Sequence, residues 1–141
     1  MNSDENIQEV YARTSIDANL FFLVNTVNRF DFEMGVTILV KGIVITGLLI
    51  SGQKYHREMA QGIAKAGTVG EALAGYFRDT AENMYAPSKN EEGEYNDTPC
   101  NYIHLKDISM QGGGGGFNKL NNAFLRVSLE EVDGHIIGNV S

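Results

Sequence analysis

Three histidines and one cysteine are the side chains of this sequence best suited to metal-ligand or nucleophilic chemistry: His56, His104, His135 and Cys100. A metal site needs imidazoles or thiolates that converge, and the chain has no HExxH, HxH or CxxC spacing that would place two ligands on one face. Cys100 precedes His104 by four residues, and a thiolate beside an imidazole would be an activated nucleophile. In an extended segment, residues four apart lie about 13 Å from each other. We therefore expect Cys100 and His104 to act as separate side chains.

Two further patterns invite a chemical interpretation. The Gly-rich loop 111–116 contains five consecutive glycines, whose exposed N–H groups could bind an anion. Phosphate-binding loops, however, need spaced glycines or a Lys-Ser/Thr pair that opens a helix, so we interpret this loop as a flexible connector between strands. Asp133-Gly134 follows two glutamates, but beside a predicted strand the pattern is typical of a hairpin turn. We expect no catalytic residue, no cofactor and no metal.

Composition narrows the classes of protein further. The chain has 141 residues with 11 Lys plus Arg against 18 Asp plus Glu, which gives a formal charge of −7. Such a charge repels nucleic-acid phosphates, and a single cysteine cannot form an internal disulfide. The first residues are acidic where a secretory signal is basic, and the most apolar window, 36–50, is shorter than the roughly 20 residues that span a bilayer. We expect a cytoplasmic protein that binds neither nucleic acid nor membrane.

The first half of the chain predicts helix, hairpin, helix and helix. Residues 1–14 are polar and acidic, which favours a flexible arm, and 15–141 is long enough for a single domain. Apolar residues then recur at helical spacing from 16 to about 29, after Ser15 and Asp17 as candidate caps. Two β-branched segments flank Lys41-Gly42, which predicts a strand hairpin with a tight turn. Helix formers from about 53 to 84 predict a helical insertion of two helices, about 53–66 and 69–84, with a break and a fresh cap at Gly67-Thr68.

The second half predicts a loop followed by three strands. Residues 86–99 contain both prolines and a cluster of acidic side chains, so an exposed acidic loop is expected there. Alternation predicts a strand from Tyr102 to about residue 110, and two short strands follow, at 123–129 and 135–140. The fold class is therefore α+β, with an N-terminal helix and a bent five-stranded antiparallel sheet that has the helical insertion between strands 2 and 3.

Aromatic and methionine side chains gather in the helical insertion. At helical spacing such residues usually form core, and a groove for an apolar partner is the second interpretation. The side chains in question are Tyr55, Met59, Tyr76, Phe77, Met84 and Tyr85. Lys54, Arg57 and Lys65 on the first of the two helices are interpreted as a solvated basic face.

Four stretches taken together resemble a known family. They are Gly35-VTILVKGIVITGLLISGQKYHREM, Tyr102-IHLKD, Phe124-Leu-Arg-Val and Glu131-VDGHIIG. In this order and spacing the chain resembles the gas vesicle accessory protein U family of bacteria. It departs from that pattern at His135, where the family has an aromatic residue, and at Phe124, where a tryptophan is expected. The motif residues carried over are Lys41, Gly42, Lys54, Tyr55, His104, Lys106, Arg126, Asp133, Gly134 and His135.

The resemblance implies a non-enzymatic accessory protein that acts on vesicle assembly or clustering and contacts other gas vesicle proteins. The order of elements is also similar to the Sm-like topology, whose exposed edge strands would pair copies into a homo-oligomer. The acidic loop around Glu91 to Asp97 and the N-terminal arm are expected to tune this association through salt and pH. Two alternatives remain open: an Sm-like oligomeric nucleic-acid-binding protein, and a small-molecule-binding or hydrolytic domain that uses His104.

Overall fold

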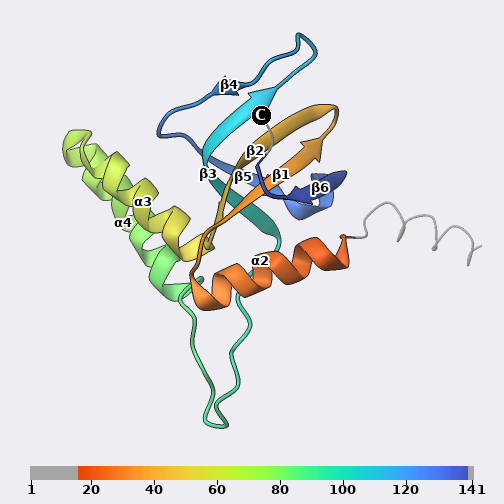
Figure 1. Cartoon of the computed structure of the whole chain (residues 1–141). Coiled ribbons are helices and arrows are strands. Elements are labelled where there is room, and N and C mark those ends of the chain that lie inside the picture. The colour runs from red at the N-terminus through yellow and green to blue at the C-terminus, as the bar shows by residue number, and fades with distance from the viewer. Residues whose placement is uncertain (1–15, 140–141) are drawn as a thin grey trace, which may run out of the picture.

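One antiparallel sheet organises the described part of the chain, with one helix on its inner face and a helical hairpin projecting from one end (Figure 1). The computed structural model describes residues 16–139. These residues form three helices and a six-stranded sheet, which confirms the predicted α+β class and the helical insertion between strands 2 and 3. The predicted arm at 1–14 lies outside the described residues.

Helix α2 (Ala18–Phe30) follows the predicted pattern. The Asp17 carboxylate caps it by accepting hydrogen bonds from the N–H groups of Asn19 and Leu20, at 2.9 and 3.0 Å. Its apolar residues recur every three or four positions and face the sheet, where Leu20, Val24 and Val27 are buried.

Strands β1 (Met34–Val40) and β2 (Ile43–Ile50) form the predicted hairpin. Lys41 and Gly42 both have positive φ, at 49° and 83°, as a two-residue type I′ turn requires. Alternate residues of both strands point toward α2, and this inner face carries the centre of the core. Its fully buried side chains include Val36, Ile38, Ile45 and Leu49.

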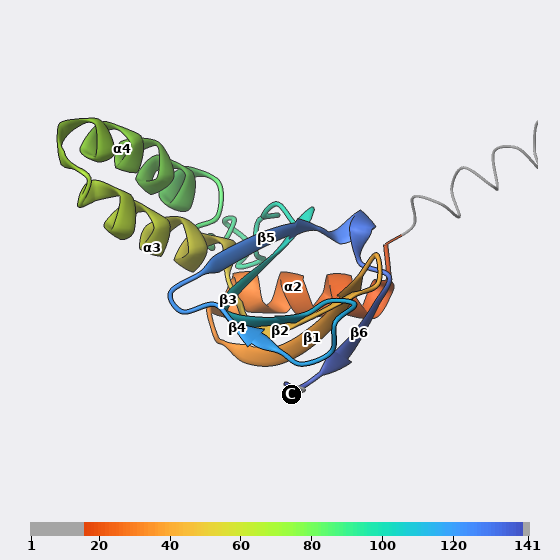
Figure 2. The ribbon, with the colours of Figure 1, turned by 90° about the horizontal axis from the view of Figure 1, so that it is seen from above.

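The helical insertion consists of α3 (Gly52–Ala64) and α4 (Gly67–Asn83), packed against each other as an antiparallel pair. Figures 1 and 2 show this hairpin leaving the sheet at one end. The Ser51 hydroxyl caps α3, but the expected cap at Gly67-Thr68 was wrong. The N-cap of α4 is Ala66, which makes no side-chain hydrogen bond, and Gly67 instead makes the turn with a φ of 87°.

The interpretation of the aromatic and methionine side chains as core holds only in part. Tyr55 and Tyr85 are buried where α3 and the end of the insertion meet the sheet. Tyr76, on a face of α4 turned away from α3, and Met84, directly after the end of α4, are more than half exposed.

The remaining strands are β3 (Tyr102–Gln111), β4 (Asn118–Lys119), β5 (Phe124–Ser128) and β6 (Gly134–Ile137). The two-residue β4 was not predicted, because it is too short to show alternation. Strands run in the order β4-β3-β2-β1-β6, and β5 also pairs with β3.

The interpretation of Asp133-Gly134 as a hairpin turn was wrong. β5 pairs with β3, whereas β6 pairs with β1 at the opposite side of the sheet. A short 3₁₀ turn, Leu129–Glu131, lies between them, and its Leu129 side chain is buried in the core. The chain therefore crosses from one edge to the other at this point.

Candidate functional site

The structure gathers the motif residues into three clusters. Lys41, Gly42, Asp133 and Gly134 lie at the β1–β2 turn, and His135 follows on β6, where it pairs with Ile38 of β1. Lys54 and Lys106 share one carboxylate. Tyr55, His104 and Arg126 lie where the helical hairpin meets the outer face of the sheet, the face opposite α2.

The first cluster fastens β6 to the β1–β2 turn. The Lys41 N–H donates to the Asp133 carboxylate at 2.8 Å, and the Asp133 N–H donates to the Leu39 carbonyl at 2.8 Å. The Lys41 ammonium also lies 3.1 Å from the Glu131 carboxylate, but both side chains are at least half exposed, so this ion pair adds little. Gly134 pairs with Leu39 in the ladder that begins here. These contacts join the β1–β2 turn to the start of β6, and this role is structural.

The second cluster is a set of charges beneath the start of α3. Glu33, just before β1, forms ion pairs with Lys54 on α3 and with Lys106 on β3, the latter at 3.1 Å. The hydrogen bond from Lys54 lowers the pKa of Glu33, and Lys106 adds to this effect against the cost of burial. Glu58 lies 3.9 Å from the Lys106 ammonium. The Glu33 carboxylate thereby joins its own segment, before β1, to α3 and to β3.

The third cluster is an aromatic box around two histidines. Rings of Tyr55 and Tyr85 lie 4.6 and 5.6 Å from the His104 ring, and His56 lies 5.7 Å from it. His56 stacks on Tyr85 at 4.9 Å and its Nδ1 donates to the Gly52 carbonyl at 2.6 Å, which assigns the neutral ring's proton to Nδ1. His56 and Tyr85 are named in the sequence analysis but were not carried over as motif residues, and their positions at the helix base become evident only in three dimensions.

His104 is the most strongly perturbed titratable group of the cluster. Its residue is 1% exposed, and its Nε2 has no hydrogen-bond partner among the described residues. Burial, together with the nearby His56 and Arg126, lowers its pKa to about 3. Burial likewise lowers the pKa of His56. Both rings are therefore neutral near pH 7, and His104 is closed off from any substrate in solution.

Arg126 closes the rim of the aromatic box. It is the cross-strand neighbour of His104, and its guanidinium lies 3.8 Å from the centre of the Tyr102 ring in a cation–π contact. Phe124, on the same strand, meets Tyr55 edge to face at 6.1 Å. The histidine and tyrosine rings of the box are thus buried, whereas Arg126 at its rim is exposed.

Cys100 lies away from the histidines, as expected. Its Sγ donates to the Asn25 amide oxygen at 3.4 Å and lies 3.8 Å from Nδ2 of Asn28. Burial raises the pKa of this thiol, which keeps it protonated near pH 7. A groove of about 510 Å³ between α2 and residues 97–101 includes Cys100 but not His104.

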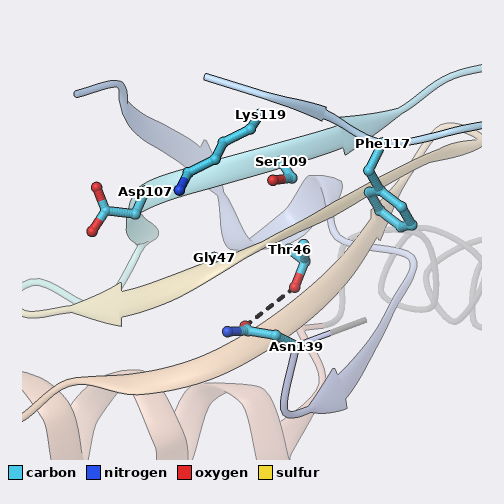
Figure 3. Close-up of a pocket in the computed structure, with 7 residues that line it drawn as sticks. All are labelled: Thr46, Gly47, Asp107, Ser109, Phe117, Lys119 and Asn139. Atoms are coloured by element: carbon cyan, nitrogen blue, oxygen red, sulfur yellow. Dashed lines mark hydrogen bonds between the residues drawn. The ribbon is translucent and has the colours of Figure 1, made fainter. Parts of the chain in front are cut away.

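A hollow of about 250 Å³ opens on the outer face of the sheet near the C-terminal end (Figure 3). Its lining comes from β2, β3, β4, the end of the Gly-rich loop and the residues after β6. These residues are Thr46, Gly47, Asp107, Ser109, Phe117, Lys119 and Asn139.

The floor of this hollow is a chain of hydroxyl and amide groups. Thr46 Oγ1 lies 3.2 Å from the Asn139 amide oxygen and 3.0 Å from Thr37 Oγ1. Hydroxyl, amide, ammonium and carboxylate groups beside one phenyl ring can bind a polar group, and the lining holds no histidine or cysteine. Sequence reasoning missed the hollow, because the glycines before Phe117 gave no sign that this ring would lie over β2.

Two further observations concern the described residues, 16–139. They contain no group of three or more His, Cys, Asp or Glu side chains placed to hold a metal ion. None of their helices is long and apolar enough to cross a membrane.

Comparison with protein-family models gives a match to the family described as gas vesicle protein GvpU-like, over residues 17–140. Comparison with curated proteins and with solved structures gives no match. The family match spans the N-terminal helix, the helical insertion and every strand of the sheet.

Proposed function

The chain belongs to the GvpU-like family of gas vesicle proteins, and from this premise we propose that it is a non-enzymatic accessory protein that associates with itself and with other gas vesicle proteins in the cytoplasm. The observation that carries the proposal is the family match over residues 17–140. Its action would be physical: it would hold proteins together and so influence vesicle assembly or clustering.

The state of the reactive side chains supports a role without catalysis. His104 is neutral and enclosed by aromatic rings, and Cys100 is a buried thiol that is hydrogen-bonded to Asn25. A general base needs to reach the proton that it abstracts. Neither group is placed to do so in the described structure, which favours binding over hydrolysis.

Self-association is supported by two strand edges. Within residues 16–139, β5 pairs only with β3 and β6 pairs only with β1, so each leaves one edge of backbone N–H and C=O groups available. Ile136 and Ile137 on β6 are 52% and 65% exposed. On β5, Leu125 and Val127 pack only partly against the core.

Joining β5 of one copy to β6 of the next would extend the sheet and cover these apolar side chains. Because the two edges are different surfaces, the contact is head-to-tail, and it gives a ring where the rotation between copies closes and an open filament where it does not. The closed ring is the Sm-like arrangement, and the helix-first order of the elements suits it.

The acidic loop supplies a means of tuning the contact by salt. Its tip, Asn90–Glu94, is a turn in which the Asn90 side chain accepts hydrogen bonds from the N–H groups of Glu92 and Glu94, at 2.9 and 3.0 Å. The loop projects away from the sheet on the side opposite β4 (Figure 1). Repulsion between such loops on neighbouring copies would weaken association at low salt.

The self-association is tested by measuring mass with light scattering over a range of protein concentrations and salt. Ile137→Glu places a charge at the β6 edge and is expected to reduce the assembled fraction, whereas Phe22→Glu, at an equally exposed site on α2, is the matched control. Assembly that is the same at low and high salt, or unaffected by Ile137→Glu, contradicts this part of the proposal. Flotation with isolated gas vesicles tests the contact with vesicle proteins, because bound protein rises with them.

A further inference from the structure

The helical hairpin packs its small residues inside and leaves large apolar ones outside. On α4, Gly70, Ala74 and Ala81 are buried against α3. A Cβ at position 70 would lie 2.3 Å from the Ile63 carbonyl oxygen, so the helices are too close for a larger side chain there. At these positions, α4 therefore contributes only small residues to the contact between the two helices.

The large side chains of α4 lie on a different face. Val69, Leu73 and Tyr76 are 72%, 55% and 67% exposed. Their spacing of four and three residues puts them in one row along the helix. On α3, Met59 and Ile63 are half-buried and four residues apart. We call these five residues the apolar face of the hairpin.

Charged residues occupy the opposite face. Arg57 of α3 pairs with Glu82 of α4 at 2.8 Å, and Arg78 pairs with Glu71 at 2.8 Å. Gln61 lies beside Arg57, Arg78 and Glu82 in the same shallow hollow.

Two positions along a helix correspond to about 200° around it, and this separates the two faces. Leu73 is two positions from Glu71, and Tyr76 is two positions from Arg78. The same spacing separates Met59 from Arg57. The charges are therefore paired within the hairpin on one face, and the other face is left apolar.

We propose that the apolar face docks on the same face of a second copy, antiparallel and about a two-fold axis near Ala74 and Gly75. This inference deepens the proposed self-association by adding an interface separate from the strand edges. The row on α4 is symmetric about that axis, because Leu73 meets Tyr76 of the second copy and Val69 meets Thr80. A two-fold contact requires such self-complementarity.

The size of the face fits a second copy. A 17-residue helix such as α4 is about 25 Å long. Two helices with axes 8–10 Å apart present a face about 20 Å wide. Pairing two such faces would bury on the order of 500 Å² on each copy, or about 1,000 Å² in total, which is the lower limit for a specific interface. The row on α4 alone would fall short of this, which is why both helices are needed.

The pairing is tested by sedimentation in the full chain carrying Ile137→Glu, where edge pairing is removed. The expected result is a dimer that Leu73→Glu or Tyr76→Glu weakens by about tenfold or more. Gln61→Glu adds the same charge to the opposite face and is expected to change nothing. Positions 73 and 76 are exposed in the single chain, so each variant is expected to fold. Circular dichroism and thermal unfolding check that it does.

Cysteine cross-linking tests the direction of the helices. A mixture of Val69→Cys and Thr80→Cys chains is expected to form a disulfide between copies, because the two positions meet across the axis. Val69→Cys alone is not expected to cross-link with itself, since its two copies would lie about 16 Å apart along the helices. Self-linking of Val69→Cys, without linking in the mixture, overturns the antiparallel arrangement.

The outcomes separate this inference from the proposed function. A dimer that Leu73→Glu leaves intact, or a chain that is monomeric throughout, overturns the hairpin interface even if the wild-type protein floats with vesicles. A dimer broken by Leu73→Glu supports the interface even if the wild-type protein fails to float, in which case the vesicle role is the part that fails.

Discussion

The backbone N–H of Lys41 donates a 2.8 Å hydrogen bond to the carboxylate of Asp133, 92 residues further along the chain. Asp133 in turn donates its own N–H to Leu39, so one residue closes the turn of the first hairpin and starts the ladder of β6. The edge strand on which the proposed assembly depends is therefore held at its beginning by one residue, through one side-chain and one backbone hydrogen bond.

Removal of that carboxylate should loosen β6. Asp133→Ala leaves the Lys41 N–H to solvent and is expected to cost about 1 kcal/mol in the free energy of unfolding. Hydrogen exchange at Ile136 and Ile137 should accelerate more than exchange in β3. Glu131→Gln removes only the exposed ion pair, and the loss there should stay below about 0.5 kcal/mol. Equal losses in the two variants, measured by urea denaturation, would contradict the account.

The two glycines at the ends of α3 should respond in opposite directions to alanine. At Gly52 a Cβ would lie 2.2 Å from the Tyr85 ring, so Gly52→Ala is expected to destabilise by about 2 kcal/mol or more. At Gly62 nothing lies within 4 Å, and Gly62→Ala should stabilise by about 0.5–1 kcal/mol through helix propensity. Thermal unfolding of the pair decides this, and a harmless Gly52→Ala would mean that Tyr85 does not pack on α3.

His104 should give the protein an acid-sensitive stability. Its pKa of about 3 in the folded chain lies below the value of 6.5 for a free imidazole, so the unfolded state takes up the proton first as pH falls. The stability present above pH 6.5 is then lost progressively down to about pH 3, and about 2 kcal/mol of it is lost by pH 5.

His104→Phe should remove much of this loss between pH 8 and pH 5 in urea titrations. His104→Gln is the matched control, because it cannot titrate but packs less well in the aromatic box. It should be less stable than His104→Phe at every pH, with an equally flattened dependence. A wild-type slope that persists in both variants would show that His104 is not its source.

Glu33 should contribute to the stability of the fold, although it lies in the short segment before β1. Hydrogen bonding to Lys54 lowers the pKa of its carboxyl, so its contribution is present above the unfolded value of 4.5 and is lost as pH falls through the lower folded value. Glu33→Gln leaves Lys54 and Lys106 without their shared partner, at an expected cost of about 1 kcal/mol at pH 7. Salt should reduce the difference between the variant and the wild type. A difference that does not depend on salt would contradict an electrostatic origin.

Local pattern predicted most of the elements. The helix over Ala18–Phe30, the hairpin with Lys41-Gly42 at its turn and the two helices of the insertion are each encoded by spacing within a short window. The crossing from β5 to β6 was mistaken for a hairpin turn, because Asp133-Gly134 has hairpin composition and its partner Leu39 lies far away in sequence. Strand pairing between distant segments is a tertiary property that turn residues do not specify.

The candidate site could be predicted from the sequence to a smaller extent than the fold. The motif identified Tyr55, His104 and Arg126 as residues of interest, but not that they meet, since one is on a helix and two are on neighbouring strands. The hollow of Figure 3 depends on where Phe117 lies after a glycine run that carries no side-chain pattern. The apolar face of the hairpin was hidden for another reason: Leu73 and Tyr76 have the spacing of a core stripe, and only their exposure shows that they are not core.

Flotation of the purified protein with isolated gas vesicles, at low and at high salt, tests the central claim most directly. The proposed function predicts that the wild-type protein rises with the vesicles, and that the Ile137→Glu chain rises in a smaller amount because fewer copies assemble on each contact. The Phe22→Glu chain should rise like the wild type. Wild-type protein that stays below the vesicle layer at both salt concentrations would contradict the role as a gas vesicle accessory protein.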